Sequence, residues 1–345
     1  MIVAGWVEAP GSDSPTFCPP LTSTSMAGFL LESIMDILRN VEVPTGNILV
    51  VQGEKGKLEC LSLGDYGQAV NLNQHQKVVH TDLLPLSKKW VCTISTQYGC
   101  SMGCQFCDVP RVGSGINASL LDIVGQVKTV RMLHPEIVGT ERFNIHYARM
   151  GEPSWNNNVV KSAEVWPYVL PDFHVHPVVS TMMPRNNSGL YDFINSWCYV
   201  KNQLYKGEAG LQLSINSTDE SEREAMFNGN AMDLQDIAFL MDGMPDPLGR
   251  KYTLNFAIAG YTIDADLLAR LFPPSRFVCK LTPMHKTTSA LEAGIKTDGD
   301  YTESYPYEED EARLKSAGFE TLVFIASKEE DESRITCGNA ILSDY

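Results

Sequence analysis

The chain has 345 residues, of which 43% are hydrophobic and 20% charged, and its formal net charge is −15 at pH 7. This length allows a sizeable core, in one large domain or one domain with a small extension. The absence of any apolar run near the roughly 20 residues of a membrane helix excludes a spanning segment, and the acidic balance argues against a large nucleic-acid partner.

The segment before residue 90 predicts an extension ahead of the main domain. Residues 1–25 are rich in Pro, Ser, Thr and Gly and are expected to be poorly ordered, whereas the apolar spacing of residues 26–40 predicts a helix. Residues 46–64 are typical of two strands around a turn at "GEKGK". The expected division is an N-terminal extension with one helix over 1–45, a β-hairpin region over 46–89, and the main domain over 90–345.

From residue 90 onward, short β-rich runs alternate with segments of helical spacing. Six such repeats predict an α/β fold with a parallel sheet, open or barrel-like. A helix over 310–319 and a strand over 320–327 are expected to close the chain. The expected strands cover 90–96, 142–150, 176–183, 211–216, 252–260 and 276–283, and the expected helices include 118–134, 189–205, 232–244 and 265–272.

Polar motifs follow these strands at one end. A cysteine-rich loop follows the first strand, "RMGEP" ends the second, "STMMPRN" the third, "SINST" the fourth and "PMHK" the sixth. Because reactive groups of parallel α/β folds gather at the carboxyl ends of the strands, we expect these motifs to form one active site.

The cysteine-rich loop "GCSMGCQFCDVP" holds Cys100, Cys104 and Cys107 in a C-x3-C-x2-C pattern. Three thiolates at this spacing can serve one metal centre. A zinc ion would need a fourth ligand, such as Cys92 or a histidine, whereas an iron–sulfur cube would take one thiolate per iron and leave one iron open. Nine cysteines without a secretory signal favour the cytoplasm, where thiols serve metals or chemistry.

This pattern after the first strand resembles the signature of the radical S-adenosylmethionine (radical SAM) superfamily. The resemblance implies a partial (βα)6 TIM-like barrel and a [4Fe-4S] cluster held by the three cysteines. It also implies that S-adenosylmethionine binds the open iron and yields a 5′-deoxyadenosyl radical. An external electron donor such as flavodoxin or ferredoxin would reduce the cluster.

The later motifs resemble one branch, the RlmN/Cfr adenine methyltransferases. "MGEP" is similar to the branch's GMGEP, with Arg149 in place of the first glycine, and "KLTPMHK" is similar to its N-L-I-P-W-N, with His285 in place of the asparagine. The residues that the resemblance assigns to the cofactor are Gly151, Glu152, Ser180, Ser214, Ile215, Asn216 and His285.

Three further residues carry the methyl transfer that this resemblance implies. Cys337, in "TCGN", would receive a methyl group from one S-adenosylmethionine and pass it as a methylene to an sp2 carbon of the substrate. Glu59 would remove the substrate proton, and Cys92, with one extra residue between it and the loop, would release the product by forming a disulfide with Cys337. Read on their own, Cys92 is typical of a small buried core residue and Glu59 of an exposed strand carboxylate.

The acidic charge and the short segment before the hairpin favour a small or medium-sized substrate with an sp2 carbon. A nucleobase within RNA is the main alternative. A second alternative is a radical enzyme that abstracts hydrogen directly from a small molecule, with Cys337 as a bystander or hydrogen donor. The sequence leaves the oligomeric state open.

Overall fold

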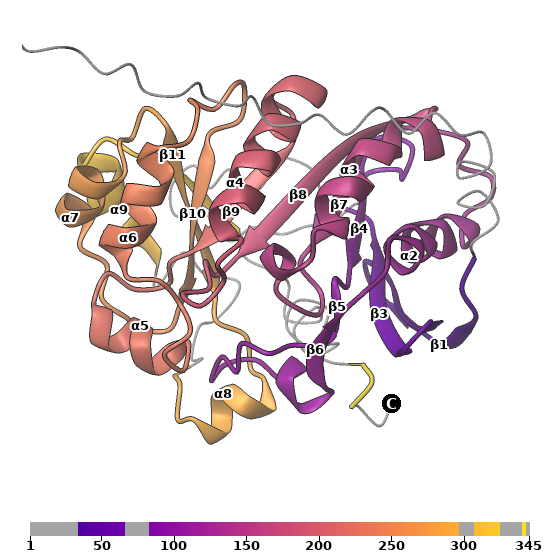
Figure 1. Ribbon diagram of the computed structural model, residues 1–345, viewed down its shortest axis with the longest axis horizontal. Helices are drawn as coiled ribbons and strands as arrows, with labels where there is room; N and C mark the ends of the chain where they lie inside the picture. The colour runs from indigo at the N-terminus through magenta and orange to yellow at the C-terminus, as the bar shows by residue number, and fades with distance from the viewer. Residues whose placement is uncertain (1–33, 66–82, 297–306, 325–339, 343–345) are drawn as a thin grey trace, which may run out of the picture.

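The computed structural model describes residues 34–65, 83–296, 307–324 and 340–342 (Figure 1). One ten-stranded sheet dominates this part of the chain, in the order β1-β2-β3-β4-β7-β8-β9-β10-β11-β12. The strands from β4 onward are parallel to one another, and β1 to β3 join them as antiparallel neighbours. The prediction of an α/β fold with a large parallel sheet is confirmed, and the sheet is open, with β1 and β12 at its edges.

The sheet strands are β1 (Ile37–Val43), β2 (Gly46–Gly53), β3 (Gly56–Leu63), β4 (Trp90–Ile94), β7 (Thr140–Tyr147), β8 (Phe173–Thr181), β9 (Gly210–Ser214), β10 (Tyr252–Ile258), β11 (Phe277–Pro283) and β12 (Glu320–Val323). The expected hairpin is β2 and β3, joined at the predicted turn. The helix expected over 26–40 is wrong in its described end, because residues 37–40 begin β1 and pair with β2. The alternation of exposed and half-buried side chains in β1 fits an edge strand.

Helices join the parallel strands, and most of them pack on one face of the sheet (Figure 1). They are α2 (Leu120–Met132), α3 (Asn158–Val169), α4 (Leu190–Tyr199) with a π-helical turn over Val200–Leu204, α5 (Glu220–Met226), α6 (Leu234–Asp242), α7 (Ala265–Leu271), α8 (Thr288–Glu292) and α9 (Tyr307–Ser316). Short 3-10 turns cover Val109–Arg111 and Pro153–Trp155. The apolar stretches at α2, α4, α6 and α7 predict these helices, whereas α3, α5 and α8 were not expected.

Two faces of the sheet differ sharply in their side chains. The face toward the helices forms one large apolar core that includes Trp90, Phe143 and Leu254, all fully buried. On β11 the residues alternate between buried and half-buried, so that Cys279 and Leu281 enter this core and Lys280 lies on the opposite, inner face. The inner face therefore carries polar, partly accessible side chains. None of the helices in the described ranges is long and apolar enough to cross a membrane.

Candidate active site

A small antiparallel ribbon brackets the cysteine loop. It consists of β5 (Gln97–Gly99) and β6 (Ser114–Asn117), directly after β4. Gly99 has φ +77°, and a Cβ there would lie 2.1 Å from the carbonyl oxygen of Gly113, so only glycine fits this position. The Cys100 N–H donates to that same carbonyl at 3.1 Å, which fixes the start of the loop.

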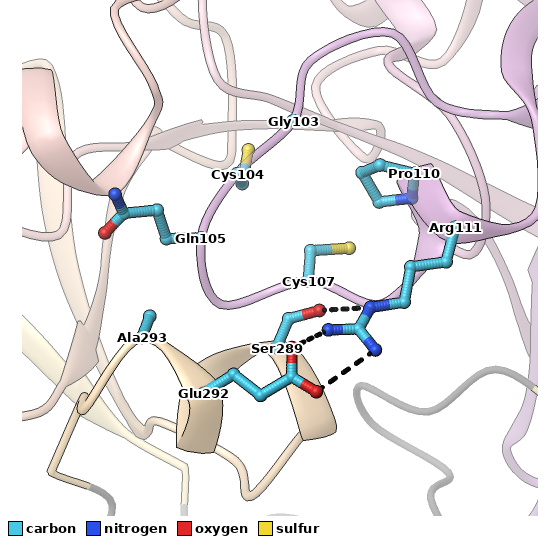
Figure 2. Close-up of a pocket in the computed structure, with 9 residues that line it drawn as sticks. All are labelled: Gly103, Cys104, Gln105, Cys107, Pro110, Arg111, Ser289, Glu292 and Ala293. Atoms are coloured by element: carbon cyan, nitrogen blue, oxygen red, sulfur yellow. Dashed lines mark hydrogen bonds and ion pairs between the residues drawn. The ribbon is translucent and has the colours of Figure 1, made fainter.

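The far end of the loop is fastened to α8. Asp108, buried beside the third cysteine, accepts hydrogen bonds from the Ser289 backbone N–H at 2.8 Å and from its hydroxyl at 2.7 Å. Arg111 donates to the Ser289 hydroxyl at 3.1 Å and pairs with Glu292. Figure 2 shows that Cys104 and Cys107 line a pocket between this part of the loop and α8. Asp108 was not predicted as a site residue, although its place directly after the last cysteine could have indicated it.

The three thiols influence one another electrostatically, so they lie close together. Burial raises the pKa of Cys100 to about 12, and the nearby Cys107 adds to the rise. Burial also raises the pKa of Cys107, to about 11, and that of Cys104 well above its usual value, with both other loop cysteines adding to the latter rise. Without a bound cation these groups are therefore neutral thiols, and thiolates there require a positive centre among them.

The donor set fits an iron–sulfur cluster. In the described part of the chain no three Cys, His, Asp or Glu side chains are arranged to hold a single metal ion. A cube differs from one ion, because each cysteine binds a different iron and the ligands stand further apart. Three half-buried thiols on one loop supply such ligands, and Cys100 and Cys104 pack against an apolar cluster that includes Met102 and Phe227. Cys104 Sγ lies 3.7 Å from Met182 Sδ, and Phe106 packs edge-on to Phe227 at 5.9 Å between centroids.

The "MGEP" turn packs directly on β5. Gly151 has φ +94°, and a Cβ there would lie 2.5 to 2.8 Å from atoms of Gln97. Glu152 is buried, and its carboxylate accepts backbone N–H groups of Ser154 and Met182, both at 3.0 Å. Burial raises the pKa of Glu152, while these hydrogen bonds favour its charged form. A carboxylate held in this way suits an ammonium group of a ligand.

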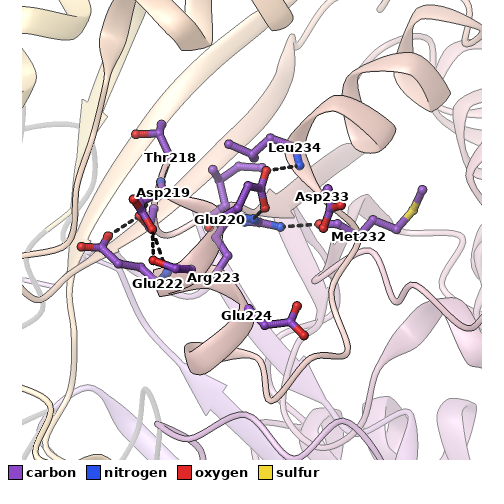
Figure 3. A network of polar contacts seen from close by, with 12 residues as sticks. Thr218, Asp219, Glu220, Glu222, Arg223, Glu224, Met232, Asp233 and Leu234 are labelled. Carbon is purple, nitrogen blue, oxygen red and sulfur yellow. Dashed lines mark hydrogen bonds and ion pairs between the residues drawn. The ribbon is translucent and has the colours of Figure 1, made fainter.

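The "SINST" segment leaves β9 in a strained turn that other residues hold in place. Asn216 has φ +60°, and its side-chain oxygen accepts the Ala257 N–H at 3.0 Å. Figure 3 shows the network beneath this turn. There the buried Arg223 pairs with Glu220 and donates to the carbonyl oxygens of Ile215 and of Met232, the latter at 2.9 Å. Arg223 was not predicted, and no motif indicates it.

The remaining cofactor residues lie at neighbouring strand ends. Ser180, near the end of β8, is half-buried on the inner face and pairs in register with Gln212. Ser214 ends β9 and pairs with Asn255. His285 is buried just beyond β11, where its carbonyl oxygen accepts the Thr287 N–H at 3.0 Å. The structure thus brings the predicted cofactor residues to one end of the parallel strands, on the side of the cysteine loop.

Glu59 is fully buried, so its interpretation as an exposed strand carboxylate is wrong. Its Oε2 accepts a hydrogen bond from Arg149 Nε at 2.8 Å, and its Oε1 accepts the backbone N–H of Ile341 at 2.8 Å. Both Glu59 and Arg149 influence the Cys107 thiol, which places this pair near the cysteine loop. The carboxylate therefore holds the C-terminal segment 340–342 against β3.

Cys92 lies on the helix-covered face of β4. It is fully buried in the large apolar core, on the same face as its register neighbour Ile145. Burial raises its pKa well above the usual value, with a further rise from Cys60, so the thiol is neutral. The structure does not bring Cys92 together with Glu59, whose carboxylate lies on the opposite face of the sheet. Cys337 lies outside the described residues.

The curated relatives of this chain are RNA methyltransferases. It is 37% identical over 93 residues to the dual-specificity RNA methyltransferase RlmN of Syntrophus aciditrophicus, covering 27% of this chain and 26% of that protein. It is 26% identical over 259 residues to RlmN of Sorangium cellulosum, covering 72% of this chain and 61% of that protein. The resemblance to RlmN is confirmed. The matches span at most about three fifths of these relatives' own lengths.

No protein-family model matches the chain. Among solved structures, the chain is similar to Streptococcus suis SuiB bound to its precursor peptide SuiA, with a TM-score of 0.46, 11% identity, and coverage of 74% of this chain and 52% of that one. The complex of SuiB with S-adenosylmethionine gives a TM-score of 0.44. Likenesses this distant support no argument about function.

Proposed function

We propose that the protein is a radical SAM C-methyltransferase that acts on an sp2 carbon. The observation that carries this proposal is the placement of the three-cysteine loop beside the "MGEP" turn and the "SINST" turn, at one end of the parallel strands. The RlmN relatives support a methyltransferase rather than another radical reaction.

The residues of the loop and the turns would hold the two cofactors. Cys100, Cys104 and Cys107 would bind a [4Fe-4S] cluster, which would supply the electron that cleaves S-adenosylmethionine to a 5′-deoxyadenosyl radical. Glu152 would accept hydrogen bonds from the amino group of S-adenosylmethionine, because it is a buried carboxylate held in place by two backbone N–H groups. The apolar cluster around Met182 and Phe227 would exclude water from the reacting centre.

Cys337 would be the methyl carrier. The described segment that follows it is anchored near the cysteine loop, since Glu59 binds the Ile341 N–H and Arg39 donates to the Ala340 carbonyl at 2.8 Å. The carrier step is a displacement, in which the Cys337 thiolate takes the methyl group and S-adenosylhomocysteine leaves.

The placement of Cys92 favours a second candidate function. Product release through a disulfide requires the Cys92 thiol to reach Cys337, yet it lies in the core on the helix-covered face of β4. An enzyme that abstracts hydrogen directly from its substrate needs no such release. In that case Cys337 would donate hydrogen or take no part.

Mass spectrometry of the peptide that carries Cys337 tests these candidates. Protein expressed with an intact cluster should show one added methyl group on this cysteine, and Cys337→Ala should cleave S-adenosylmethionine without methylating a substrate. Cys279→Ala, which changes another buried core cysteine, is the matched control. An unmodified Cys337 in protein that cleaves S-adenosylmethionine would overturn the methyltransferase proposal in favour of direct hydrogen abstraction.

A further inference from the structure

Three cations gather on the inner face of the sheet, away from the helices. Lys280 lies on this face of β11 and pairs in register with Asn255. Arg142, near the start of β7, donates to Asn144 Oδ1 at 3.2 Å. Arg250 precedes β10, and its Nη1 would lie 3.5 Å from a Cβ added to Gly210. We call Lys280, Arg142 and Arg250 the inner cation cluster.

Within the described part of the chain, no carboxylate lies within ion-pair distance of these three cations. Lys280 makes no hydrogen bond there and only approaches the Phe324 ring, at 5.4 Å from its centroid. Arg142 binds an amide oxygen, and Arg250 donates to the backbone carbonyl of Glu208 at 3.3 Å. Among the described residues, the half-exposed carboxylate of Glu208 lies 3.3 Å from His176 Nδ1 and partly offsets the fall in the pKa of Arg250 that burial causes.

Other cations near the same sheet have partners. Lys89, at the start of β4, pairs with Asp65 at 2.8 Å, and Lys251, next to Arg250 in the chain, pairs with Glu320 at 2.6 Å. The three cations of the inner cation cluster differ from these two lysines in having no carboxylate within ion-pair distance among the described residues. Holding cations together without partners destabilises a fold, so a protein of net charge −15 gains nothing structural from this arrangement.

The groups around the cluster respond as expected for concentrated positive charge. Burial lowers the pKa of His146 on β7 to about 3, and Lys280, Arg250, Lys89 and Arg142 lower it further. Burial lowers the pKa of Lys280 to about 8, with Arg250 adding to the effect. These groups on β7, beside β10 and on β11 thus lie close enough to one another for their charges to interact.

We propose that the inner cation cluster binds a phosphate or carboxylate group of a small substrate. Lysine and arginine are the side chains that recognise such anions, and arginine can bind two of their oxygens at once. That the ligand is the substrate rests on the proposed methyltransferase function, whereas the anion site itself does not. The inner face also carries half-buried polar residues, such as Ser214 and Asn255, which would contact the rest of the molecule.

The position of the cluster sets how the substrate lies. Lys280 stands three residues before the end of β11, about 10 Å below the strand end. The anionic group would lie deep against the inner face, and the reacting carbon would lie at the strand ends near the cysteine loop. A medium-sized molecule spans this distance. An RNA backbone would meet the same cations only if the polymer entered the inner face.

Binding of inorganic phosphate to the cluster-containing enzyme tests the site without requiring catalysis. Phosphate should bind saturably and raise the melting temperature, and Lys280→Met and Arg142→Met should each weaken binding about tenfold or more, because each removes a charged hydrogen bond. Lys251→Met is the matched control and should bind phosphate like the wild type. Both cluster variants should melt no lower than the wild type without phosphate.

Malonate and a short RNA distinguish the possible sources of the anionic group. Malonate binding more tightly than phosphate would identify a carboxylate substrate, and the reverse order would identify a phosphorylated one. The proposal is overturned if neither anion binds, if Lys280→Met and Lys251→Met respond alike, or if a short RNA displaces phosphate while small anions do not. Phosphate binding with an unmethylated Cys337 would retain the anion site and reject only the methyltransferase function.

Discussion

Replacement of Glu59 by Gln tests whether this carboxylate holds the C-terminal segment. The change removes the carboxylate that forms an ion pair with Arg149, whose side chain is only 3% exposed while that of Glu59 is fully buried. Breaking a buried ion pair by removing one partner costs about 3–5 kcal/mol, because the other charge stays buried and uncompensated. The same change also weakens the acceptor for the Ile341 N–H.

Glu141→Gln provides the matched control. Glu141 pairs with Lys88 at the start of the same sheet, but the two side chains are 66% and 57% exposed. An exposed pair contributes at most about 1 kcal/mol. Urea denaturation, followed through the fluorescence of the buried Trp90 and Trp166, should therefore show a much larger loss for Glu59→Gln. Equal losses in the two variants would refute the reasoning.

Methylation of Cys337 separates an anchoring role of Glu59 from a proton-accepting one. A base acts after the carrier is methylated, so its loss should leave methylated Cys337 and abolish product. An anchor acts earlier, so Glu59→Gln should lower Cys337 methylation as well. Ile341→Pro, which removes the N–H that Glu59 binds while leaving the Glu59–Arg149 ion pair in place, should reproduce the anchoring effect if Glu59→Gln fails to fold.

Three other outcomes follow from the structure. Gly151→Ala should weaken S-adenosylmethionine binding and cost about 1–3 kcal/mol by thermal denaturation, whereas Gly260→Ala, at φ +77° with no atom near its added Cβ, should leave binding unchanged. Cys92→Ala should cost on the order of 1 kcal/mol and leave Cys337 methylation unchanged by mass spectrometry; an accumulating substrate–enzyme adduct would instead assign it to product release. Lys280 has a folded pKa of about 8, below the value of about 10.4 in an unfolded chain, so the unfolded state binds more protons between these values. In urea titrations, the free energy of unfolding of the wild type relative to Lys280→Met should therefore rise as the pH rises from about 8 to about 10.4. Over the same range, calorimetry should show that the affinity of the wild type for phosphate falls, because Lys280 loses its charge.

The spacing of the apolar residues was enough to predict the parallel sheet and to place the polar motifs at the carboxyl ends of its strands. It was not enough for β1, because the side chains of Ile37–Val43 alternate only between exposed and half-buried, so no fully buried apolar face marks the strand. The long-range contacts of the candidate site could not be predicted from the sequence. Asp108 reaches α8 and Glu59 reaches Ile341, across separations of 181 and 282 residues. Such contacts depend on how distant segments pack in the folded protein, and no local sequence pattern predicts them.

The single extra residue between Cys92 and the cysteine loop has a structural consequence. In a strand, a shift of one residue moves a side chain to the other face of the sheet. Without that residue the count back from Cys100 reaches Thr93, which lies on the inner face and pairs in register with Leu61. Leu61 packs in the small apolar cluster that receives Ala340, so Thr93 stands next to the anchored C-terminal segment. At the position that the shorter spacing would give, the strand therefore carries a hydroxyl and not a thiol. From this placement we predict that release of a methylated product from Cys337 does not use the thiol of Cys92, and the Cys92→Ala variant tests this.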